Sequence, residues 1–165
     1  MNDNTLYFAK VHPEAIIPTK REEDGCYDIY VIFDDNEITI KPHEIKTFNT
    51  GLAMAVSSKY RLDFQRERGS TGSIAIVPRC GQVDSGYRGE VFLKLQNTSD
   101  NYIVISKDVT STHEKEGITY YPYSKAVCQM AVEVVPVMEE EVISFEKLQE
   151  IPSLRGTGSL GSSGK

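Results

Sequence analysis

Short runs of β-branched and aromatic residues recur along most of the chain, and several of them alternate apolar and polar positions. Alternation with a period of two is typical of strands that bury one face, whereas an amphipathic helix repeats about every 3.6 residues. The runs that predict strands are residues 27–33, 37–42, 50–56, 60–64, 74–77, 89–97, 102–106 and 126–137. Their spacing of roughly eight to twelve residues favours an all-β sandwich or barrel over βαβ units.

The segments between these runs indicate turns and one long connection. Asp34 to Asn36 is typical of a hairpin turn, and Pro42 to Glu44 of a second bend. Residues 106–122 are polar and charged, which predicts a long surface loop or an extra hairpin. Helix signals are scarce, and the sequence predicts one short helical turn in residues 144–151 with Ser144 as its N-cap.

Composition restricts the classes of function. The 165 residues amount to one domain, and the hydrophobic and charged fractions, 39% and 25%, are ordinary for a soluble globular protein. A formal net charge of −6 argues against a broad basic surface for duplex nucleic acid, but it leaves room for a local cationic pocket that takes a phosphorylated small molecule. No apolar run approaches the roughly 20 residues that span a bilayer, and the start of the chain lacks a secretory signal. We therefore expect a cytoplasmic protein without nucleic-acid or membrane partners.

The three cysteines, Cys26, Cys80 and Cys128, are odd in number and widely spaced, and the histidines lie near none of them in sequence. Disulfide frameworks use an even set of cysteines, and zinc knuckles use closely spaced Cys and His ligands. Reduced thiols are the simpler interpretation.

The densest chemistry lies in residues 80–90, where two predicted strands flank a turn with Asp84, Tyr87 and three glycines. Glycine lets a backbone approach a ligand closely or take a positive φ. An Asp beside such a turn can activate water, and a Tyr can form a stacking platform. The alternative interpretation is an ordinary β-hairpin in which Asp84 caps the turn.

This stretch closely resembles the third of five ordered motifs in the trimeric dUTP diphosphatases (dUTPases). The other four motifs have counterparts in the same order. The stretches that resemble the five motifs are GCYDI (25–29), RGSTG (68–72), GQVDSGYRGE (81–90), VCQM (127–130) and the Gly-rich RGTGSLGSSG (155–164). Five matches in order over nearly the whole chain are far more specific than any single one.

The resemblance implies a fold, an assembly and a reaction. The fold is an all-β, jelly-roll-like distorted β-barrel over residues 1–150, followed by a flexible Gly/Ser-rich C-terminal arm over residues 151–165. The assembly is a homotrimer with shared active sites, because in this family the carboxylate hairpin, the phosphate cradle and the arm come from different subunits. The reaction is hydrolysis of dUTP to dUMP and pyrophosphate, with Mg²⁺ chelated by the substrate phosphates.

The resemblance also assigns roles to residues. Asp84 matches the catalytic Asp that activates water for attack on the α-phosphate, and Asp28 matches an Asp that touches the water shell of the metal. The implied substrate-binding residues are Arg68, Gly69, Ser70 and Gln129 for the phosphates, Gly81, Gln82 and Val83 for uracil, Tyr87 for deoxyribose, and Arg155, Leu160, Gly161, Ser162 and Ser163 for the closing arm. We expect the amides of Thr71 and Gly72 to add donors to the phosphate cradle.

Departures from the family pattern indicate a divergent bacterial or phage-like branch. Gly69 stands where the family usually has Ser, Leu160 replaces a Phe in the arm, and the connection at 106–122 is longer than usual. Two alternatives remain. A dCTP deaminase on the same fold needs a Glu base where this chain has Lys94. A dUTPase-fold regulatory protein would use nucleotide as a switch and bind a protein partner through residues 106–122.

Overall fold

The regular structure of the protein is mostly β-strand, as the alternation of apolar and polar residues predicts. The computed structural model describes residues 2–158, and the side chain of Arg66 lies outside the description. The elements are β1 (Tyr7–Lys10), β2 (Tyr27–Ile29), β3 (Glu37–Ile40), β4 (Ile45–Ala55), β5 (Tyr60–Arg66), α1 (Gly69–Gly72), β6 (Ile76–Pro78), β7 (Gln82–Val83), β8 (Glu90–Asn97), β9 (Tyr102–Ser106), β10 (His113–Lys115), β11 (Ile118–Pro122), β12 (Cys128–Val134) and α2 (Phe145–Glu150).

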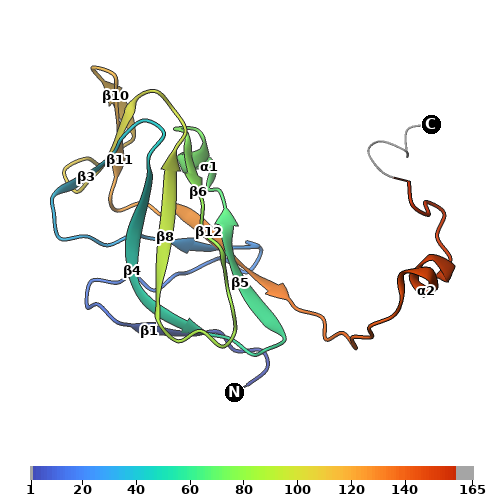
Figure 1. Ribbon diagram of the computed structural model, residues 1–165. Coiled ribbons are helices and arrows are strands. Elements are labelled where there is room, and N and C mark those ends of the chain that lie inside the picture. The colour runs from blue at the N-terminus through green and yellow to red at the C-terminus, as the bar shows by residue number, and fades with distance from the viewer. Residues whose placement is uncertain (1, 159–165) are drawn as a thin grey trace.

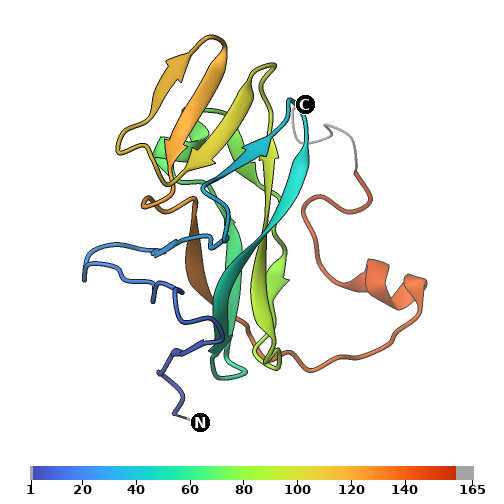
Figure 2. The same cartoon turned by 90° about the vertical axis from the view of Figure 1, so that its left-hand side faces the viewer.

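The strands form three sheets of four strands each, with the orders β1-β4-β8-β6, β10-β11-β9-β3 and β2-β12-β5-β7. Figures 1 and 2 show these sheets packed around one interior, with the β10–β11 hairpin at one end of the body. Most pairs are antiparallel, but β11 runs parallel to β9. Within the described residues the sheets do not close into a single barrel.

Alternation along β8 shows how the sequence builds the core. Val91, Leu93 and Leu95 are buried, whereas Phe92 and Lys94 between them face outward. Because successive side chains of a strand point to opposite faces, one face of β8 reaches the core and the other reaches the surface. The core also holds Cys80 and Cys128.

The prediction of reduced thiols is confirmed, since the three cysteines are free. Burial raises the pKa of the Cys80 thiol and raises that of Cys128 well above its ordinary value. Desolvation disfavours the thiolate, so both thiols are poor nucleophiles.

Some local predictions were wrong or incomplete. Residues 34–36 form a bend but do not join two strands of a hairpin, because β2 pairs with β12 whereas β3 pairs with β9. The sequence did not reveal β1 or β7, which are short strands paired with β4 and β5. The polar segment 106–122 contains the β10–β11 hairpin, which agrees with the second of the two predictions for it.

The chain leaves the sheets after β12, and the views in Figures 1 and 2 both show the following segment with α2 standing apart from the body. The predicted N-cap of α2 is confirmed, because Ser144 accepts a hydrogen bond from the Lys147 amide at 3.3 Å. Phe145, Leu148 and Ile151 are all more than half exposed. The predicted division into residues 1–150 and 151–165 stays a prediction.

Gly51 provides a test of how tightly the body is packed. Its φ is +67°, and an added Cβ would lie 2.6 Å from Ile32 Cδ1 and 2.9 Å from Ala15 Cβ. We expect Gly51→Ala to lower the free energy of unfolding by about 2–4 kcal/mol, from backbone strain and overpacking together. Gly117, with φ +76° and open space around it, is the matched control. Gly117→Ala should cost only about 1–2 kcal/mol. The free energy of unfolding of both variants is measured by urea unfolding. If Gly51→Ala and Gly117→Ala lower it equally, Gly51 is packed more loosely than these distances imply.

Candidate active site

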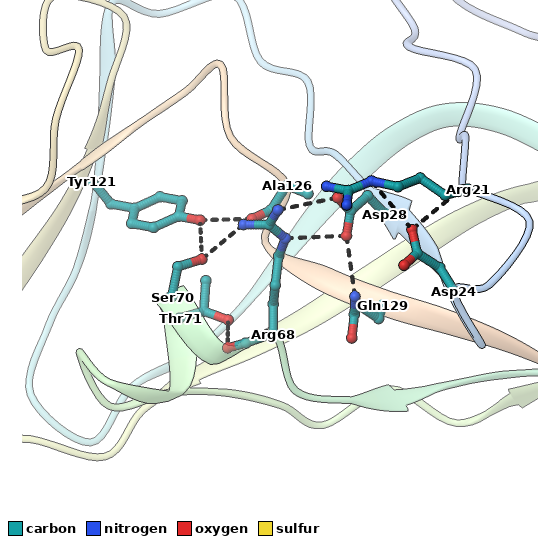
Figure 3. A network of polar contacts seen from close by, with 9 residues as sticks. All are labelled: Arg21, Asp24, Asp28, Arg68, Ser70, Thr71, Tyr121, Ala126 and Gln129. Carbon is teal, nitrogen blue, oxygen red and sulfur yellow. Dashed lines mark hydrogen bonds and ion pairs between the residues drawn. The ribbon is translucent and has the colours of Figure 1, made fainter.

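Arg68 forms the centre of the first polar cluster, which Figure 3 shows from close by. It lies two residues beyond the end of β5. Its guanidinium donates from Nε to Asp28 Oδ1 at 3.0 Å and from Nη2 to Asp28 Oδ2 at 3.1 Å. Gln129 Nε2 donates to the same Oδ1 at 3.3 Å. The sheet accounts for this convergence, because Gln129 on β12 lies opposite Asp28 on β2 and opposite Arg66 at the end of β5.

Asp28 holds the positively charged guanidinium of Arg68 in a fixed orientation. The two side chains are 32% and 27% exposed, so the pair is neither fully hydrated nor sealed in the core. The hydrogen bonds that Arg68 donates to Asp28 raise the pKa of Arg68 above its ordinary value, and the guanidinium stays charged at any physiological pH. A bidentate arginine of this kind matches carboxylate and phosphate geometry.

The cavity beside Arg68 measures about 320 Å³. Its lining is polar and includes Arg21, Asp24, Asp28, Arg68 and Gln129. The two guanidinium groups and two carboxylates of this lining cancel formally. A polyanion bound here therefore needs further positive charge from elsewhere.

Ser70 and Tyr121 extend the cluster on its other side. Arg68 Nη1 donates to Ser70 Oγ at 3.0 Å, Ser70 Oγ lies 3.1 Å from Tyr121 Oη, and Tyr121 Oη donates to the Ala126 carbonyl at 2.6 Å. Tyr121 was not among the residues expected from the sequence. It falls in the mostly polar segment 106–122, where the run Tyr120-Tyr121-Pro122 is the one signal that could have pointed to a buried strand end.

The amides of Thr71 and Gly72, expected as phosphate donors, have another partner. Both donate to the Arg68 carbonyl, at 3.0 and 2.8 Å, as does the Thr71 hydroxyl at 3.0 Å. These bonds form the turn of α1 and fix the backbone at Arg68. In this structure the two amides are thus structural donors.

A second cavity, of about 250 Å³, lies on the hairpin that the sequence singled out. Gln82, Val83, Asp84 and Tyr87 line it together with the start of β8. The Asp84 carbonyl accepts from the Tyr87 amide at 3.0 Å, so the main chain closes the turn. Asp84 is exposed, and its carboxylate has no hydrogen bond or ion pair within residues 2–158. The structure therefore does not use Asp84 as a side-chain cap, and the carboxylate is available to a ligand or water.

Tyr87 lies across Gly89, where a side chain would collide with it. Its hydroxyl donates to the Glu90 carbonyl at 2.8 Å, and a Cβ on Gly89 would lie 2.4 Å from that hydroxyl oxygen. The Tyr87 side of the cavity is accessible, since this residue is 43% exposed. Glycine at 89 is thus what allows the ring to be held flat against its own hairpin.

The structure places the remaining expected residues as follows. Gly69 begins α1 beside Arg68, and Gly81 lies in the exposed segment before β7. Arg155 lies on the segment beyond α2, where its Nε donates to the Gly158 carbonyl at 2.8 Å. Leu160, Gly161, Ser162 and Ser163 lie outside the described residues.

One chain does not bring all these groups to one place. The Arg68 cluster and the Asp84 hairpin belong to the same sheet, at β2-β12-β5 and at β7, yet they line separate cavities. Residues 2–158 contain no group of three or more His, Cys, Asp or Glu side chains that could hold a metal ion. The helices of this part of the chain are too short to cross a membrane.

Known proteins resemble the chain along almost its whole length, although no protein-family model matches it. A protein of Picosynechococcus sp. named deoxyuridine 5′-triphosphate nucleotidohydrolase is 30% identical over 162 residues, which cover 96% of this chain and 98% of that protein. A protein of the same name from Nautilia profundicola is 29% identical over 163 residues, covering 97% and 99%. The structure of Staphylococcus bacteriophage 80alpha dUTPase with dUPNHPP has a TM-score of 0.73 at 22% identity, covering 98% of this chain and 99% of that one. This likeness confirms the expected jelly-roll fold.

The Arg68 cluster predicts that guanidinium geometry, and not charge alone, binds an anion. Lys in place of Arg68 keeps the charge but cannot hold Asp28 and Ser70 from three nitrogens at once. We expect Arg68→Lys to weaken pyrophosphate binding about tenfold, as expected for losing hydrogen bonds to charged groups. Titration calorimetry measures this change.

Arg61 is the matched control, since its Nε and Nη2 also donate to a carboxylate, that of Glu133, at 3.1 and 3.0 Å. Arg61→Lys should leave pyrophosphate binding unchanged. If both variants bind alike, the Arg68 cluster is not the anion site.

Proposed function

Because this chain belongs to the deoxyuridine 5′-triphosphate nucleotidohydrolase (dUTPase) family, and so is a dUTP diphosphatase, we propose that Asp84 activates the water that cleaves dUTP into dUMP and pyrophosphate. The observation that supports this role most strongly is the unpaired carboxylate of Asp84 in the same cavity as Tyr87. A general base must be free to accept a proton and must sit where the substrate is held. An Asp is a weak base, so positioning and charge neutralisation have to provide much of the acceleration.

The hairpin cavity is proposed to bind the nucleoside. Tyr87 packs against the deoxyribose and leaves no room for a 2′-hydroxyl. The main chain of Gly81, Gln82 and Val83 supplies the hydrogen bonds of uracil, and cytosine would leave some of these groups unpaired. A buried polar group without a partner costs about 1–3 kcal/mol, which is enough to select one base.

The Arg68 cluster is proposed to bind the phosphates. Arg68 and Gln129 present donors to the 320 Å³ cavity, and Gly69 and Ser70 border the same guanidinium. Mg²⁺, chelated by the three phosphates, would neutralise charge that this cavity cannot, since its own charges cancel. Asp28 holds Arg68 with both oxygens, and Oδ1 also accepts from Gln129, so Oδ2 is the oxygen that retains lone-pair capacity for a water of the metal's shell.

A shared site in a homotrimer accounts for the separation of the two cavities. Residues after β12 extend away from the body, and residues 2–158 leave the apolar side chains of Phe145, Leu148 and Ile151 more than half exposed. We propose that this segment lies on another copy of the chain. Its continuation through Arg155, Leu160, Gly161, Ser162 and Ser163 then closes over base and phosphates, which adds one more positive charge.

Deamination of dCTP is the weaker alternative. The position that needs a Glu base holds Lys94, an exposed residue of β8 whose amide bonds Cys80 Sγ. An ammonium group cannot accept the proton. A regulatory role through residues 106–122, and a cytoplasmic location, stay predictions.

One assay separates these functions. Purified protein is incubated with dUTP and with dCTP, and pyrophosphate and ammonia are measured in parallel. We expect pyrophosphate from dUTP only. Ammonia from dCTP would identify a deaminase, and nucleotide binding without either product would identify a regulatory protein.

The catalytic role of Asp84 predicts a specific loss. Asp84→Asn keeps the shape and the hydrogen bonding but cannot take a proton, so kcat should fall about 10²- to 10⁴-fold while dUTP binding is retained. Asp35→Asn, at an exposed bend, is the control and should keep full activity. Loss of binding without a change in kcat would make Asp84 a structural turn residue.

The proposed role of Tyr87 in sugar recognition predicts a change in the preference for dUTP over UTP. Tyr87→Ala opens the space beside the sugar, so the ratio of kcat/KM for dUTP over UTP should fall at least about tenfold, the scale expected for contacts worth 1–3 kcal/mol. Tyr102→Ala removes a similarly exposed tyrosine, 47% against 43%, at a distant position on β9. The ratio of kcat/KM for dUTP over UTP should not change in Tyr102→Ala. A constant ratio in both variants removes Tyr87 from sugar recognition.

A further inference from the structure

Hydrogen-bond direction is fixed along the chain of groups from Ala126 to Arg68. The Ala126 carbonyl can only accept, so Tyr121 Oη, at 2.6 Å, must donate its single hydrogen there. The contact of 3.1 Å between Tyr121 Oη and Ser70 Oγ then requires Ser70 to donate. Ser70 has spent its own hydrogen, so it meets Arg68 Nη1, at 3.0 Å, as an acceptor.

We propose that Tyr121 is a positioning residue of the phosphate site, which acts by taking the hydrogen of Ser70 and so fixing the Ser70 hydroxyl with a lone pair toward Arg68. Tyr121 itself is fully buried and contacts no solvent. The guanidinium is held by Asp28 on two nitrogens and by Ser70 on the third, so its plane cannot rotate. The hydroxyl of Ser70 thus serves Arg68 and not a phosphate oxygen, which deepens the function proposed above and rests on it.

The contact between Tyr121 and Ser70 connects the segment 106–122 to the proposed phosphate site. Tyr121 lies on β11 opposite Ile105 of β9, so the returning strand of this segment delivers its hydroxyl to Ser70. The base of the segment is fixed by Lys107, whose Nζ donates to the Phe33 and Asp34 carbonyls at 2.7 and 3.1 Å. The same ammonium lies 5.3 and 5.1 Å from the ring centroids of Phe33 and Tyr123. An anchored strand is what a positioning residue needs.

The first test compares Tyr121→Phe with the wild-type protein. The phenyl ring keeps the packing, but Ser70 loses its acceptor and Arg68 loses its oriented partner. We expect KM for dUTP and Kd for pyrophosphate to rise about 3- to 10-fold, the scale of one hydrogen bond, with kcat changed less than about threefold. Tyr120→Phe is the control on the same strand, because Tyr120 stacks on His113 with ring centroids 5.2 Å apart and is remote from Ser70's bonds. It should change neither constant.

The second test asks whether Tyr121 acts through Ser70. In a Ser70→Ala background, Tyr121→Phe should add less than about a twofold change to pyrophosphate affinity, because linked residues are not additive. The melting temperature is followed in all four proteins. The proposal is overturned if Tyr121→Phe has its full effect in the Ser70→Ala background, or if it lowers the melting temperature and leaves pyrophosphate affinity unchanged.

Two further comparisons keep the result decisive. If Tyr121→Phe does not fold, Ser70→Ala should still weaken pyrophosphate binding and Ser70→Thr, which keeps a hydroxyl, should restore it; equal affinity in both contradicts the proposal. If the wild-type protein does not turn over dUTP, the proposed function fails. The pyrophosphate affinities still decide the role of Tyr121.

Discussion

The bidentate ion pair between Arg68 and Asp28 is the interaction on which the candidate site depends. It joins the end of β5 to β2, and Gln129 on the strand between them donates to the same carboxylate. Three segments far apart in sequence therefore meet at one guanidinium because their strands are neighbours in one sheet. A planar cation held in this way needs little reorganisation when an anion arrives, and this preorganisation is a principal source of electrostatic catalysis.

Charge balance explains why the same pair cannot be the complete site. The carboxylates that hold the arginines also cancel their charge, and the free carboxylate of Asp84 lies in another cavity. A nucleoside triphosphate must bring its own counter-ion and must recruit groups from beyond this surface. In the shared site proposed above, these groups would come from the segment after β12 of a neighbouring copy, which has an exposed apolar face and carries Arg155. The proposed sharing of the site would thus account both for the separate cavities and for the extended C-terminal segment.

The sequence predicted local features well and distant partners poorly. Asp84 and Tyr87 lie in one turn, so their shared cavity follows from their spacing, and Ser144 caps α2 through a residue three positions away. Alternation also revealed most strands, but it does not specify which strand pairs with which. Residues 34–36 therefore predict a hairpin turn, although β3 pairs with β9. Tyr121 was missed for the same reason, because its importance comes from a parallel pairing inside a segment whose composition is that of a surface loop.

The central claim is that water, activated by Asp84, attacks the α-phosphorus of dUTP. Hydrolysis in water enriched in ¹⁸O, followed by mass spectrometry of both products, tests this claim most directly. One ¹⁸O atom should enter dUMP, and pyrophosphate should remain unlabelled. Label in pyrophosphate, with unlabelled dUMP, would place the attack on the β-phosphorus and contradict the account.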